Sequence, residues 1–351
     1  MKGFLNDYYK RKIGSLPDHL TAGEDPPAGG DEVPEAMRIG NRKTAGPQDR
    51  KTARLAILVD KRGWAYHEKA LEKARYIRDE WCTEIFFLED NPKIDPAEFD
   101  LLYNFNHTPS KYDELFHGRL IKGLYSHYYL GSFIPWRYIY RMVRYASVLV
   151  VANREQAEEI KPYFKNTAVL PDGVNTGQFY MEKERTGDEI VAGWSGNPGR
   201  RLNGRRVKRF YEVVDPACRS AGIELKVGLK MSRDELRRMY NDVDVVLIAS
   251  VTEGNPLCLF EAGACGRTVI ATSVGVVPEI IEDGVNGFII DAGLSDRKTE
   301  GLMTARLLWC RQHPSETRLM GQRLREKILL TRTPEITGAA FKSLLNNINT
   351  L

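Results

Sequence analysis

The chain has 351 residues, of which 42% are hydrophobic and 28% are charged, and its net charge is +4. This balance is typical of a soluble globular protein with enough apolar residues for two cores, so two domains are expected. Five widely spaced cysteines without a C-x-x-C pair argue against a disulfide framework or a zinc site. The mildly basic charge fits an anionic ligand or surface but does not identify one.

The sequence shows neither a membrane-spanning segment nor a secretory signal. No stretch approaches the ~20 uninterrupted apolar residues that cross a bilayer, and MKGFLNDYYKRKIG at the start lacks an apolar core and a cleavage site. We therefore expect a cytoplasmic protein, with a peripheral membrane contact as an open alternative. Residues 1–50 are expected to be a flexible N-terminal extension, because residues 21–50 are rich in Pro, Gly and charges. Residues 1–20 form a short amphipathic piece, expected to dock on the body of the protein rather than on a partner or a membrane.

The folded part is expected to begin with RLAILVD (54–60), a run typical of a buried parallel strand. Helical spacing over 68–81 and the strand-like TEIFFLED (83–90) follow. Further strands are predicted over 100–106, 119–126, 147–153 and 167–174, with helices around 133–146 and over 154–164. This alternation predicts a parallel sheet covered by helices, so residues 51–176 should form an N-terminal Rossmann-like domain.

A second alternation begins near Glu189. Strands are predicted over 189–196, 223–229, 244–250, 268–273 and 287–291, and helices near 204–220, 233–241, 256–265, 277–282, 299–330 and 335–349. The two halves predict an α/β protein of two Rossmann-like domains that face each other across a cleft, with ligands at the carboxyl ends of the strands. The second domain would span 177–335, and residues 336–351 would form a C-terminal helix that could cross back to the first domain.

The segment after the strand 244–250 has the features of an anion site. A turn at 253–255 follows the strand, and Pro256 can open a helix at its first position. The first amides of a helix lack intrahelical acceptors and its dipole is positive there, which suits a diphosphate. Glu261 follows Glu253 after about two helical turns and lies on roughly the same face.

Glu253 and Glu261, with seven residues between them, resemble the E-x7-E motif of retaining glycosyltransferase family 4, whose fold is GT-B. The residues downstream agree, with small residues from Ala262 to Gly266, then VIAT and VG-x-x-PEII-x-DG-x-x-G-F. LPDGVNTGQF (170–179) is similar to the family's P-N-G-V-D-x-x-x-F between domains. The similarity covers about residues 54–335, and it is strong in the second half and loose in the first.

The resemblance implies roles for the residues of this segment. Glu253 would approach the donor sugar as a catalytic residue, and Glu261 would accept hydrogen bonds from the ribose hydroxyls. The backbone of Gly254, Asn255, Pro256 and Leu257 would contact the sugar and the distal phosphate. Without the surrounding motif, the plainer interpretation is that Glu253 caps a helix and Glu261 is a solvated helix residue.

A basic run follows the first strand of the second half. Its members are Arg200, Arg201, Arg205, Arg206, Lys208 and Arg209. Family 4 places a basic pair here, written G-R-L and then K-G, to bind two phosphates. After Gly196 this sequence has Asn197 where the pattern expects Arg, and Lys208 is followed by Arg209 instead of Gly.

Lys208 is the best match to the lysine of the pattern, and Arg201 is the candidate substitute for the missing arginine. Together with Gly196 and Asn197 they complete the expected phosphate loop. Two alternatives stay open. At least half of the run could be a solvated helix face, and the run could bind nucleic acid, although no aromatic residues interleave with it.

The first half supplies weaker candidates. Gly63 and Trp64 follow the first strand, where a close backbone approach to the donor phosphate is expected. His127 in SHYY (126–129) resembles the histidine that often touches the donor sugar in this family, which makes it the second catalytic candidate. His107 is its competitor, and a merely structural or exposed histidine is the plainer interpretation.

Asp242-Val243-Asp244 has the D-x-D spacing of the metal site in the other glycosyltransferase fold. These residues open a strand, whereas metal-binding carboxylates are expected beyond its carboxyl end, so a helix cap and strand entry explain them better. We therefore expect no metal and no cofactor. Backbone amides with Arg and Lys would neutralise the leaving diphosphate.

The implied reaction transfers a sugar from a UDP- or GDP-linked donor to a hydroxyl acceptor with retention at the anomeric carbon. Front-face displacement is the mechanism that the resemblance favours, with the leaving phosphate oxygen helping to deprotonate the acceptor. Two alternatives stay open, namely a sugar-nucleotide epimerase on the same scaffold and an inactive donor- or nucleic-acid-binding module. The acceptor is not identified. Residues 124–145 could line its site or contact anionic lipid, although a packed helix is the favoured interpretation.

Overall fold

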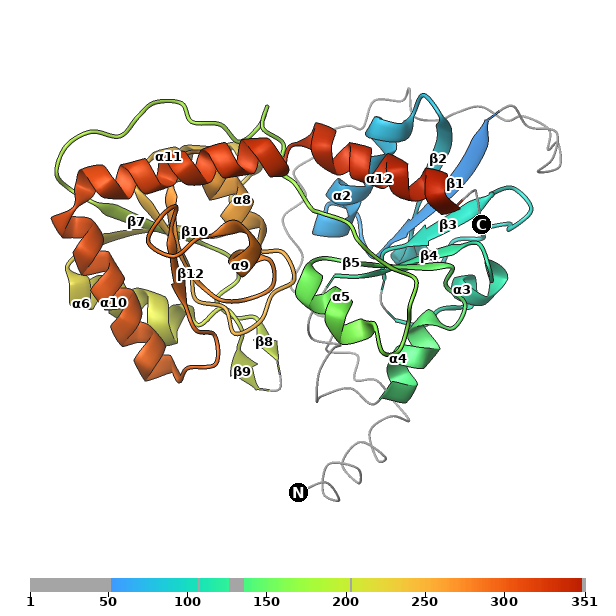
Figure 1. The fold of residues 1–351 in the computed structure, drawn as a ribbon, viewed down its shortest axis with the longest axis horizontal. Helices are drawn as coiled ribbons and strands as arrows, with labels where there is room; N and C mark the ends of the chain where they lie inside the picture. The colour runs from blue at the N-terminus through green and yellow to red at the C-terminus, as the bar shows by residue number, and fades with distance from the viewer. Residues whose placement is uncertain (1–51, 107, 126–135, 203, 349–351) are drawn as a thin grey trace, which may run out of the picture. The chain divides into compact units, whose positions relative to one another are not determined.

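The computed structural model describes residues 52–106, 108–125, 136–202 and 204–348 (Figure 1). The expected N-terminal extension, His107 and His127 therefore lie outside the described residues. Within the described part the chain forms two parallel α/β halves, each with its own sheet. We call them the first half (52–170) and the second half (190–331).

The sheet of the first half consists of short apolar strands in the order β2-β1-β3-β4-β5-β6, all parallel. Its strands are β1 (Ala53–Val59), β2 (Trp81–Phe87), β3 (Leu101–Asn104), β4 (Leu120–Leu124), β5 (Val148–Val151) and β6 (Thr167–Val169). Its helices are α2 (Ala65–Ile77), α3 (Lys111–Leu115), α4 (Trp136–Val143) and α5 (Arg154–Ile160), with a 3-10 turn at Leu88–Asp90. Side chains of β1 alternate between two buried clusters, because successive residues of a strand point to opposite faces.

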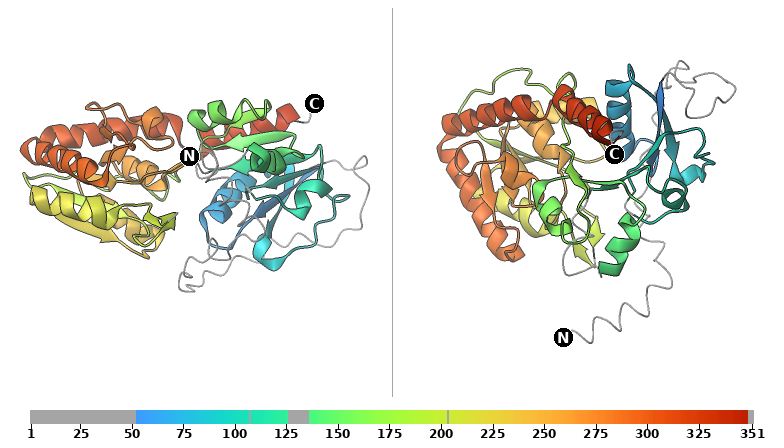
Figure 2. Two further views of the ribbon diagram at one scale, coloured as in Figure 1. Left: turned by 90° about the horizontal axis from the view of Figure 1, so that it is seen from below. Right: turned by 45° about the vertical axis from the view of Figure 1, so that its right-hand side comes forward.

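The sheet of the second half has the order β10-β7-β11-β12-β13, again all parallel. Its strands are β7 (Val191–Ser195), β10 (Glu224–Gly228), β11 (Val245–Ile248), β12 (Thr268–Thr272) and β13 (Phe288–Ile290). Its helices are α6 (Asp215–Ala221), α7 (Arg233–Asn241), α8 (Leu257–Ala264), α9 (Val277–Ile280), α10 (Asp296–Gln312) and α11 (Pro314–Thr331). Val246 and Ile248 of β11 pack with α8 and α11, whereas Val245 and Leu247 pack with α6 and α10. Helices therefore cover both faces of the sheet (Figure 2).

The last helix, α12 (Pro334–Ile348), packs on the first half. Phe341 and Leu345 belong to the same buried cluster as β1 and α2. At Gly338 an added Cβ would lie 2.2 Å from the ring of Tyr76 on α2, so the two helices touch closely there. Among the described residues no helix has the length and apolar content needed to cross a bilayer.

Three elements differ from the sequence prediction. The predicted helix 204–220 begins as a hairpin of β8 (Arg201–Leu202) and β9 (Arg205–Arg206), followed by a π-helical turn at Phe210–Val214. Gly204 has a φ of +81°, which turns the hairpin. The predicted helix 299–330 is two helices, because Pro314 cannot continue α10 and opens α11 instead. The prediction missed α3, whose five residues are too few to show a helical period.

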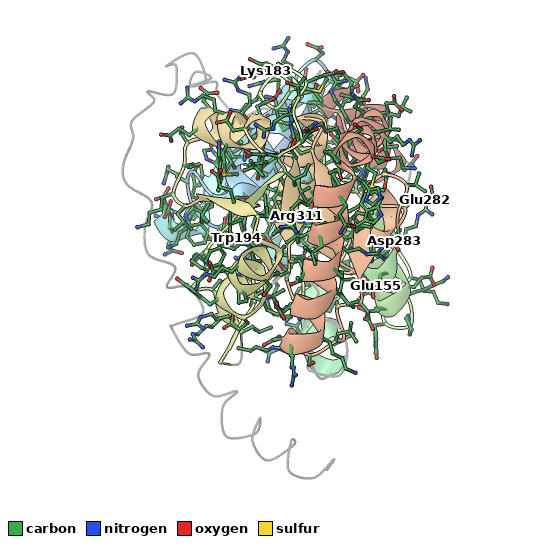
Figure 3. All side chains as sticks on the ribbon, turned by 90° about the vertical axis from the view of Figure 1, so that its left-hand side faces the viewer. Glu155, Lys183, Trp194, Glu282, Asp283 and Arg311 are labelled. Atoms are coloured by element: carbon green, nitrogen blue, oxygen red, sulfur yellow. The ribbon has the colours of Figure 1, made fainter. Side chains whose placement is uncertain are left out.

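The π-helical turn brings an aromatic contact into the core of the second half. Phe210 packs on Trp194 of β7, with ring centroids 4.6 Å apart. Trp194 is buried, whereas Lys183, Glu282 and Asp283 are exposed (Figure 3). The turn that follows the basic run is thus fixed by packing, and this fixes the position of the run itself.

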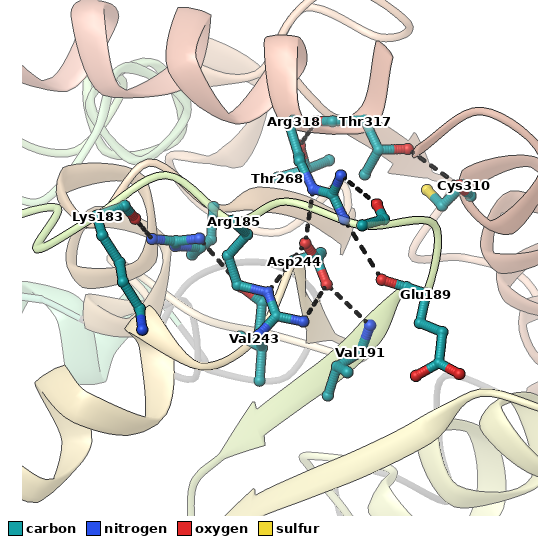
Figure 4. Close-up of polar contacts among 12 residues, drawn as sticks. Lys183, Arg185, Glu189, Val191, Val243, Asp244, Thr268, Cys310, Thr317 and Arg318 are labelled. Carbon is teal, nitrogen blue, oxygen red and sulfur yellow. Dashed lines mark hydrogen bonds and ion pairs between the residues drawn. The ribbon is translucent and has the colours of Figure 1, made fainter. Parts of the chain in front are cut away.

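Asp244 is a buried carboxylate that joins three separate segments of the chain. Arg185 Nη2, Arg318 Nε and the amide of Val191 each donate to it at 3.0 Å (Figure 4). Asp242, in contrast, is the exposed C-cap residue of α7, 3.5 Å from Lys226. The two carboxylates of the D-x-D spacing therefore have separate structural partners.

We expect Asp244→Ala to lower the free energy of unfolding by about 3–5 kcal/mol, because it leaves two partly buried arginines without their counter-charge. Asp242→Ala is the matched control and should stay within about 0.5 kcal/mol of the parent, because its ion pair is exposed. Thermal unfolding of both variants measures the difference. Equal midpoints for the two variants would contradict the structural role of Asp244.

Candidate functional site

The strand order brings two loops together at the carboxyl edge of the second sheet. β7 and β11 are parallel neighbours, and the chain leaves β7 toward β10 but leaves β11 toward β12, on the opposite side. Open α/β sheets bind ligands where their connections diverge in this way. The loops 196–209 and 249–256 therefore meet at the expected place for a ligand.

Lys208 and Glu253, which come from these two loops, form an ion pair. Lys208 Nζ lies 2.5 Å from Glu253 Oε1, and Ser250 Oγ donates to the same oxygen at 2.8 Å. The two side chains are 16% and 13% exposed, so the pair is largely shielded from water. Lys208 and Glu253 were predicted separately to contact the donor, and in the structure they are in direct contact with each other.

The ion pair changes the acidity of both partners. Burial alone would raise the pKa of Glu253, but the Lys208 ammonium and the Ser250 hydroxyl outweigh it and the pKa falls below 4.5. Burial likewise acts to lower the pKa of Lys208, but Glu253 outweighs it and the pKa rises above 10.5. At neutral pH Glu253 is therefore a carboxylate that can accept hydrogen bonds but has no proton to donate.

Arg209 explains the departure of this loop from the lysine–glycine pattern. Its φ of 48° is in the left-handed region, which glycine adopts without strain and other residues rarely adopt. Its buried guanidinium donates to the carbonyls of Ala249 and Ser250 and to Thr299 Oγ1. These bonds stabilise the strained residue and attach the loop to the end of β11.

The other arginines of the run lie in different places. Arg201 donates to the carbonyl of Gly204 at 2.6 Å, within the hairpin. Arg200 lies close enough to Lys208 and Glu253 for its charge to act on the pKa of both, in the lowering direction. The sequence interpretation chose Arg201 as the substitute for the missing arginine, and the structure adds Arg200 as a second candidate.

Gly196 and Asn197 form the turn after β7. Gly196 has a φ of +147°, and an added Cβ would lie 3.4 Å from the Trp194 ring and 3.7 Å from Lys208 Cε. Asn197 Oδ1 accepts from the amide of Gly199 at 2.9 Å. Asn197 is therefore exposed and shapes the turn at the position where the family pattern has a cation.

The loop before α8 is held by close backbone packing. A Cβ on Gly254 would lie 2.0 Å from the carbonyl oxygen of Tyr125, and one on Gly275 would lie 2.0 Å from the carbonyl oxygen of Gly254. The Gly254 carbonyl accepts from Asn153 Nδ2 at 3.2 Å and from the amide of Val276 at 3.0 Å. The sequence interpretation missed Asn153 and Gly275, although Gly275 lies in the V-G pair of the downstream motif.

Pro256 is the N-cap residue of α8 and Leu257 is its first residue. Within the described ranges no group accepts from the amides of Gly254, Asn255 and Leu257. Glu253 is not the cap, so the plainer interpretation of that residue is wrong. Cys258, in the first turn of α8, lies close enough to Lys208 and Glu253 for their charges to act on its pKa, so this turn is near the ion pair.

The side chain of Asn255 donates hydrogen bonds within the protein. Its Nδ2 donates to Asp172 Oδ2 at 2.7 Å and to the Ala152 carbonyl at 3.3 Å. Asp172 is buried and also forms an ion pair with Lys69 of α2. Burial would raise the pKa of Asp172, but Lys69 and Lys73 outweigh it and the pKa is lowered. Asp172 replaces the asparagine of the P-N-G-V pattern, and the sequence interpretation did not select it or Lys69.

Glu261 is 4% exposed, so its interpretation as a solvated helix residue is wrong. Arg233 Nη1 donates to its Oε1 at 2.7 Å, and the Tyr240 hydroxyl donates to its Oε2 at 3.1 Å. Both oxygens face partners from α7. Neither Arg233 nor Tyr240 was selected from the sequence, because nothing in their spacing marks them as partners of a residue more than 20 positions away.

Residues 205–304 match the family model described as "Glycosyl transferases group 1". Over 60 residues the chain is 43% identical to D-inositol 3-phosphate glycosyltransferase of Mycolicibacterium vanbaalenii, and over 60 residues 40% identical to the protein of that name from Mycolicibacterium smegmatis. Each stretch is 17% of this chain, and it spans 13% of the first relative and 14% of the second.

Solved structures resemble the chain over a longer range. Sucrose-phosphate synthase from Thermosynechococcus elongatus aligns with a TM-score of 0.65 and 11% identity, over 85% of this chain and 99% of that one. HepE from Anabaena, in complex with UDP-glucose, aligns with a TM-score of 0.63 and 17% identity, over 84% and 99%. The chain has the GT-B fold. This confirms the fold class predicted from the sequence.

The candidate residues of the first half, Gly63 and Trp64, form their contacts with other residues of that half. The amide of Gly63 donates to His67 Nδ1 at 3.0 Å, and Lys61 Nζ lies 4.9 Å from the centroid of the Trp64 ring. Trp64 is the N-cap residue of α2. The catalytic candidate His127 lies outside the described residues, so its role stays a prediction.

The opposite pKa shifts of Glu253 and Lys208 predict a pH-dependent contribution to stability. A carboxyl group whose pKa is lowered on folding stabilises the folded state at pH values above its unfolded pKa, and this stabilisation is lost as the pH falls through its folded pKa. A lysine whose pKa is raised on folding stabilises the folded state below its unfolded pKa, and this stabilisation is lost as the pH rises through its folded pKa. Lys208→Met should therefore lower the unfolding midpoint more at about pH 7 than at about pH 4. Lys226→Met, which removes one partner of the more exposed pair with Asp242, is the control and should have only a small effect at either pH. A Lys208→Met effect that does not change with pH would contradict the ion pair.

Proposed function

We propose that this protein is a glycosyltransferase that moves a sugar from a UDP- or GDP-linked donor to a hydroxyl acceptor, with retention of configuration and without a metal or a cofactor. The observation that carries the proposal is the Lys208–Glu253 pair beside the first turn of α8, at the point where the connections of the sheet diverge. Structures of HepE in complex with UDP-glucose and with UDP support a donor of this class.

The diphosphate would lie between the first turn of α8 and the cations of the loop after β7. Lys208 supplies one positive charge, and Arg200 and Arg201 are the two candidates for the second. The amide hydrogens around Gly254 to Leu257 would donate to the distal phosphate, since the first helical turn has no acceptors of its own. Fixed donors and cations stabilise the charge that develops on the leaving phosphate without reorganising during the reaction.

Glu253 would accept hydrogen bonds from the donor sugar. Its lowered pKa argues against a role as a general acid at neutral pH, and its ion pair with Lys208 argues against a role as a nucleophile. Retaining glycosidases use two carboxyl groups about 5–5.5 Å apart, one as acid and one as nucleophile. We therefore favour front-face displacement, in which the phosphate oxygen that leaves takes the acceptor proton.

The remaining assignments extend this proposal. Glu261 would bind the ribose hydroxyls. The first half would bind the acceptor, with Gly63 and Trp64 close to the donor phosphate and His127 in contact with the donor sugar. We propose the boundaries 51–176 and 177–335 for the two domains, and a cytoplasmic protein with a peripheral contact to a membrane or another anionic surface. An epimerase or an inactive module, including one that binds nucleic acid, remains as an outcome of the tests.

A screen of UDP-, GDP- and ADP-sugars by thermal shift tests the donor site. One nucleotide class should raise the unfolding midpoint, because a ligand at 100 times its Kd stabilises the folded state by about 2.7 kcal/mol. Labelled sugar should then pass to an acceptor in the presence of EDTA. Conversion of the donor without transfer would indicate an epimerase. Donor binding without either reaction would indicate an inactive module. No shift of the midpoint with any nucleotide would contradict the proposal.

Arg200→Ala should weaken binding of the nucleoside diphosphate by about tenfold, the typical value of one charge-assisted hydrogen bond. Arg201→Ala is the matched comparison on the adjacent residue, and its guanidinium is bonded to Gly204. Calorimetric titration of both variants with UDP and GDP identifies the second cation. If only Arg201→Ala loses affinity, Arg201 is the second cation, as the sequence predicted. If neither variant loses affinity, the phosphates bind elsewhere.

A further inference from the structure

The two partners of Glu261 differ in their freedom to move. Tyr240 is fully buried on α7 and cannot leave its place, whereas the Arg233 side chain is 46% exposed at the start of the same helix. One oxygen of Glu261 is therefore held by a fixed donor and the other by a donor that solvent can reach. This asymmetry has a consequence for any ligand that binds Glu261.

Tyr240 fixes the orientation of Glu261. Its hydroxyl lies 2.8 Å from Ser195 Oγ, at the carboxyl end of β7, and donates to Glu261 Oε2 at 3.1 Å. Burial raises the pKa of Tyr240, so its hydroxyl stays protonated and acts as a donor at neutral pH. Because the ring is inaccessible, Tyr240 acts on a ligand only through Glu261 and is a positioning residue.

Arg233 has contacts that do not depend on Glu261. Its guanidinium carbon lies 4.6 Å from the centroid of the Phe179 ring, and its Nε lies 3.4 Å from Gln178 Oε1. The side chain can therefore leave the carboxylate and keep its stacking partner. Departure without a replacement would leave a buried carboxylate with one donor only, which is strongly unfavourable because nothing then replaces its hydration.

We propose that Arg233 is an internal competitor for Glu261, which a vicinal diol replaces on Oε1 while Tyr240 keeps Oε2 in place. The inference rests on the proposed function and deepens it, because the hydroxyls of a ribonucleotide are such a diol. A nucleotide without the 2′- and 3′-hydroxyls brings no donor and leaves the ion pair with Arg233 intact. Arg233 and Tyr240 then determine how strongly the site selects ribose.

The test is the ratio of the Kd of a dideoxynucleotide to the Kd of the matching ribonucleotide, measured by calorimetry. The pairs are 2′,3′-dideoxy-UDP with UDP, and 2′,3′-dideoxy-GDP with GDP. Tyr240→Phe should weaken binding of the ribonucleotide on the order of tenfold and leave the dideoxynucleotide unchanged, because one hydrogen bond to a charged group is lost. Arg233→Met should have the opposite sign, with tighter binding of the ribonucleotide and no change for the dideoxynucleotide. Arg237→Met is the control on the same helix, since Arg237 pairs with Glu182 and Tyr180 and should leave the ratio unchanged.

Glu261→Ala distinguishes failure of the nucleoside site from failure of the competition by Arg233. If this variant loses the preference for ribose but Tyr240→Phe and Arg233→Met keep the parent ratio, the competitor is refuted and the nucleoside site stands. If Tyr240→Phe weakens both nucleotides equally, Tyr240 has a merely structural role. Weaker ribonucleotide binding in Arg233→Met would make Arg233 a ligand contact and refute the competition. An unchanged ratio in Glu261→Ala, or no binding of either nucleotide by the parent, would refute the nucleoside site together with the inference.

Discussion

Burying a carboxylate away from water costs several kcal/mol unless a cation and hydrogen-bond donors replace its hydration. Asp172, Asp244 and Glu261 are buried and Glu253 is largely shielded from water, and each of the four is paired with at least one cation. These pairs join segments that are distant in sequence, and they decide which loops lie beside one another. The geometry of the candidate site follows from this requirement, because the pairs of Asp172, Glu253 and Glu261 all surround α8 or the loop that leads into it.

The four carboxylates differ in how completely the protein satisfies them. Asp244 receives two arginines and an amide, so it has a structural role. Glu253 receives one lysine and one hydroxyl and stays partly accessible, and Glu261 has an exposed arginine as one of its partners. Carboxylates that face the loops at the carboxyl edge thus retain partners that a ligand can share or replace. This gradation separates residues that support the fold from those that we propose to bind the donor.

The sequence predicted the strands well, because apolar runs such as those of β1 and β11 have few alternatives in a parallel sheet. It also predicted that Lys208, Glu253 and the start of α8 belong to one site, which the motif and its spacing imply. It could not predict the hairpin at 201–206, where a short β turn replaces the expected helix. Arg209, Asp172, Arg233 and Tyr240 were missed or misjudged for a common reason. Their roles depend on partners more than 20 positions away, or on a left-handed backbone, and neither leaves a local pattern.

The packing of α12 on α2 and β1 affects the order in which the protein can fold as it is made. The core cluster of the first half includes Phe341, Leu345 and Ile348, which are among the last described residues to leave the ribosome. At about 5–20 residues per second, the strands of the first half wait on the order of ten seconds or longer for these side chains. During that interval the apolar surface that α12 later covers is open to solvent and to chaperones. The first half, although it is synthesised before the second half, is therefore the later of the two to complete its core.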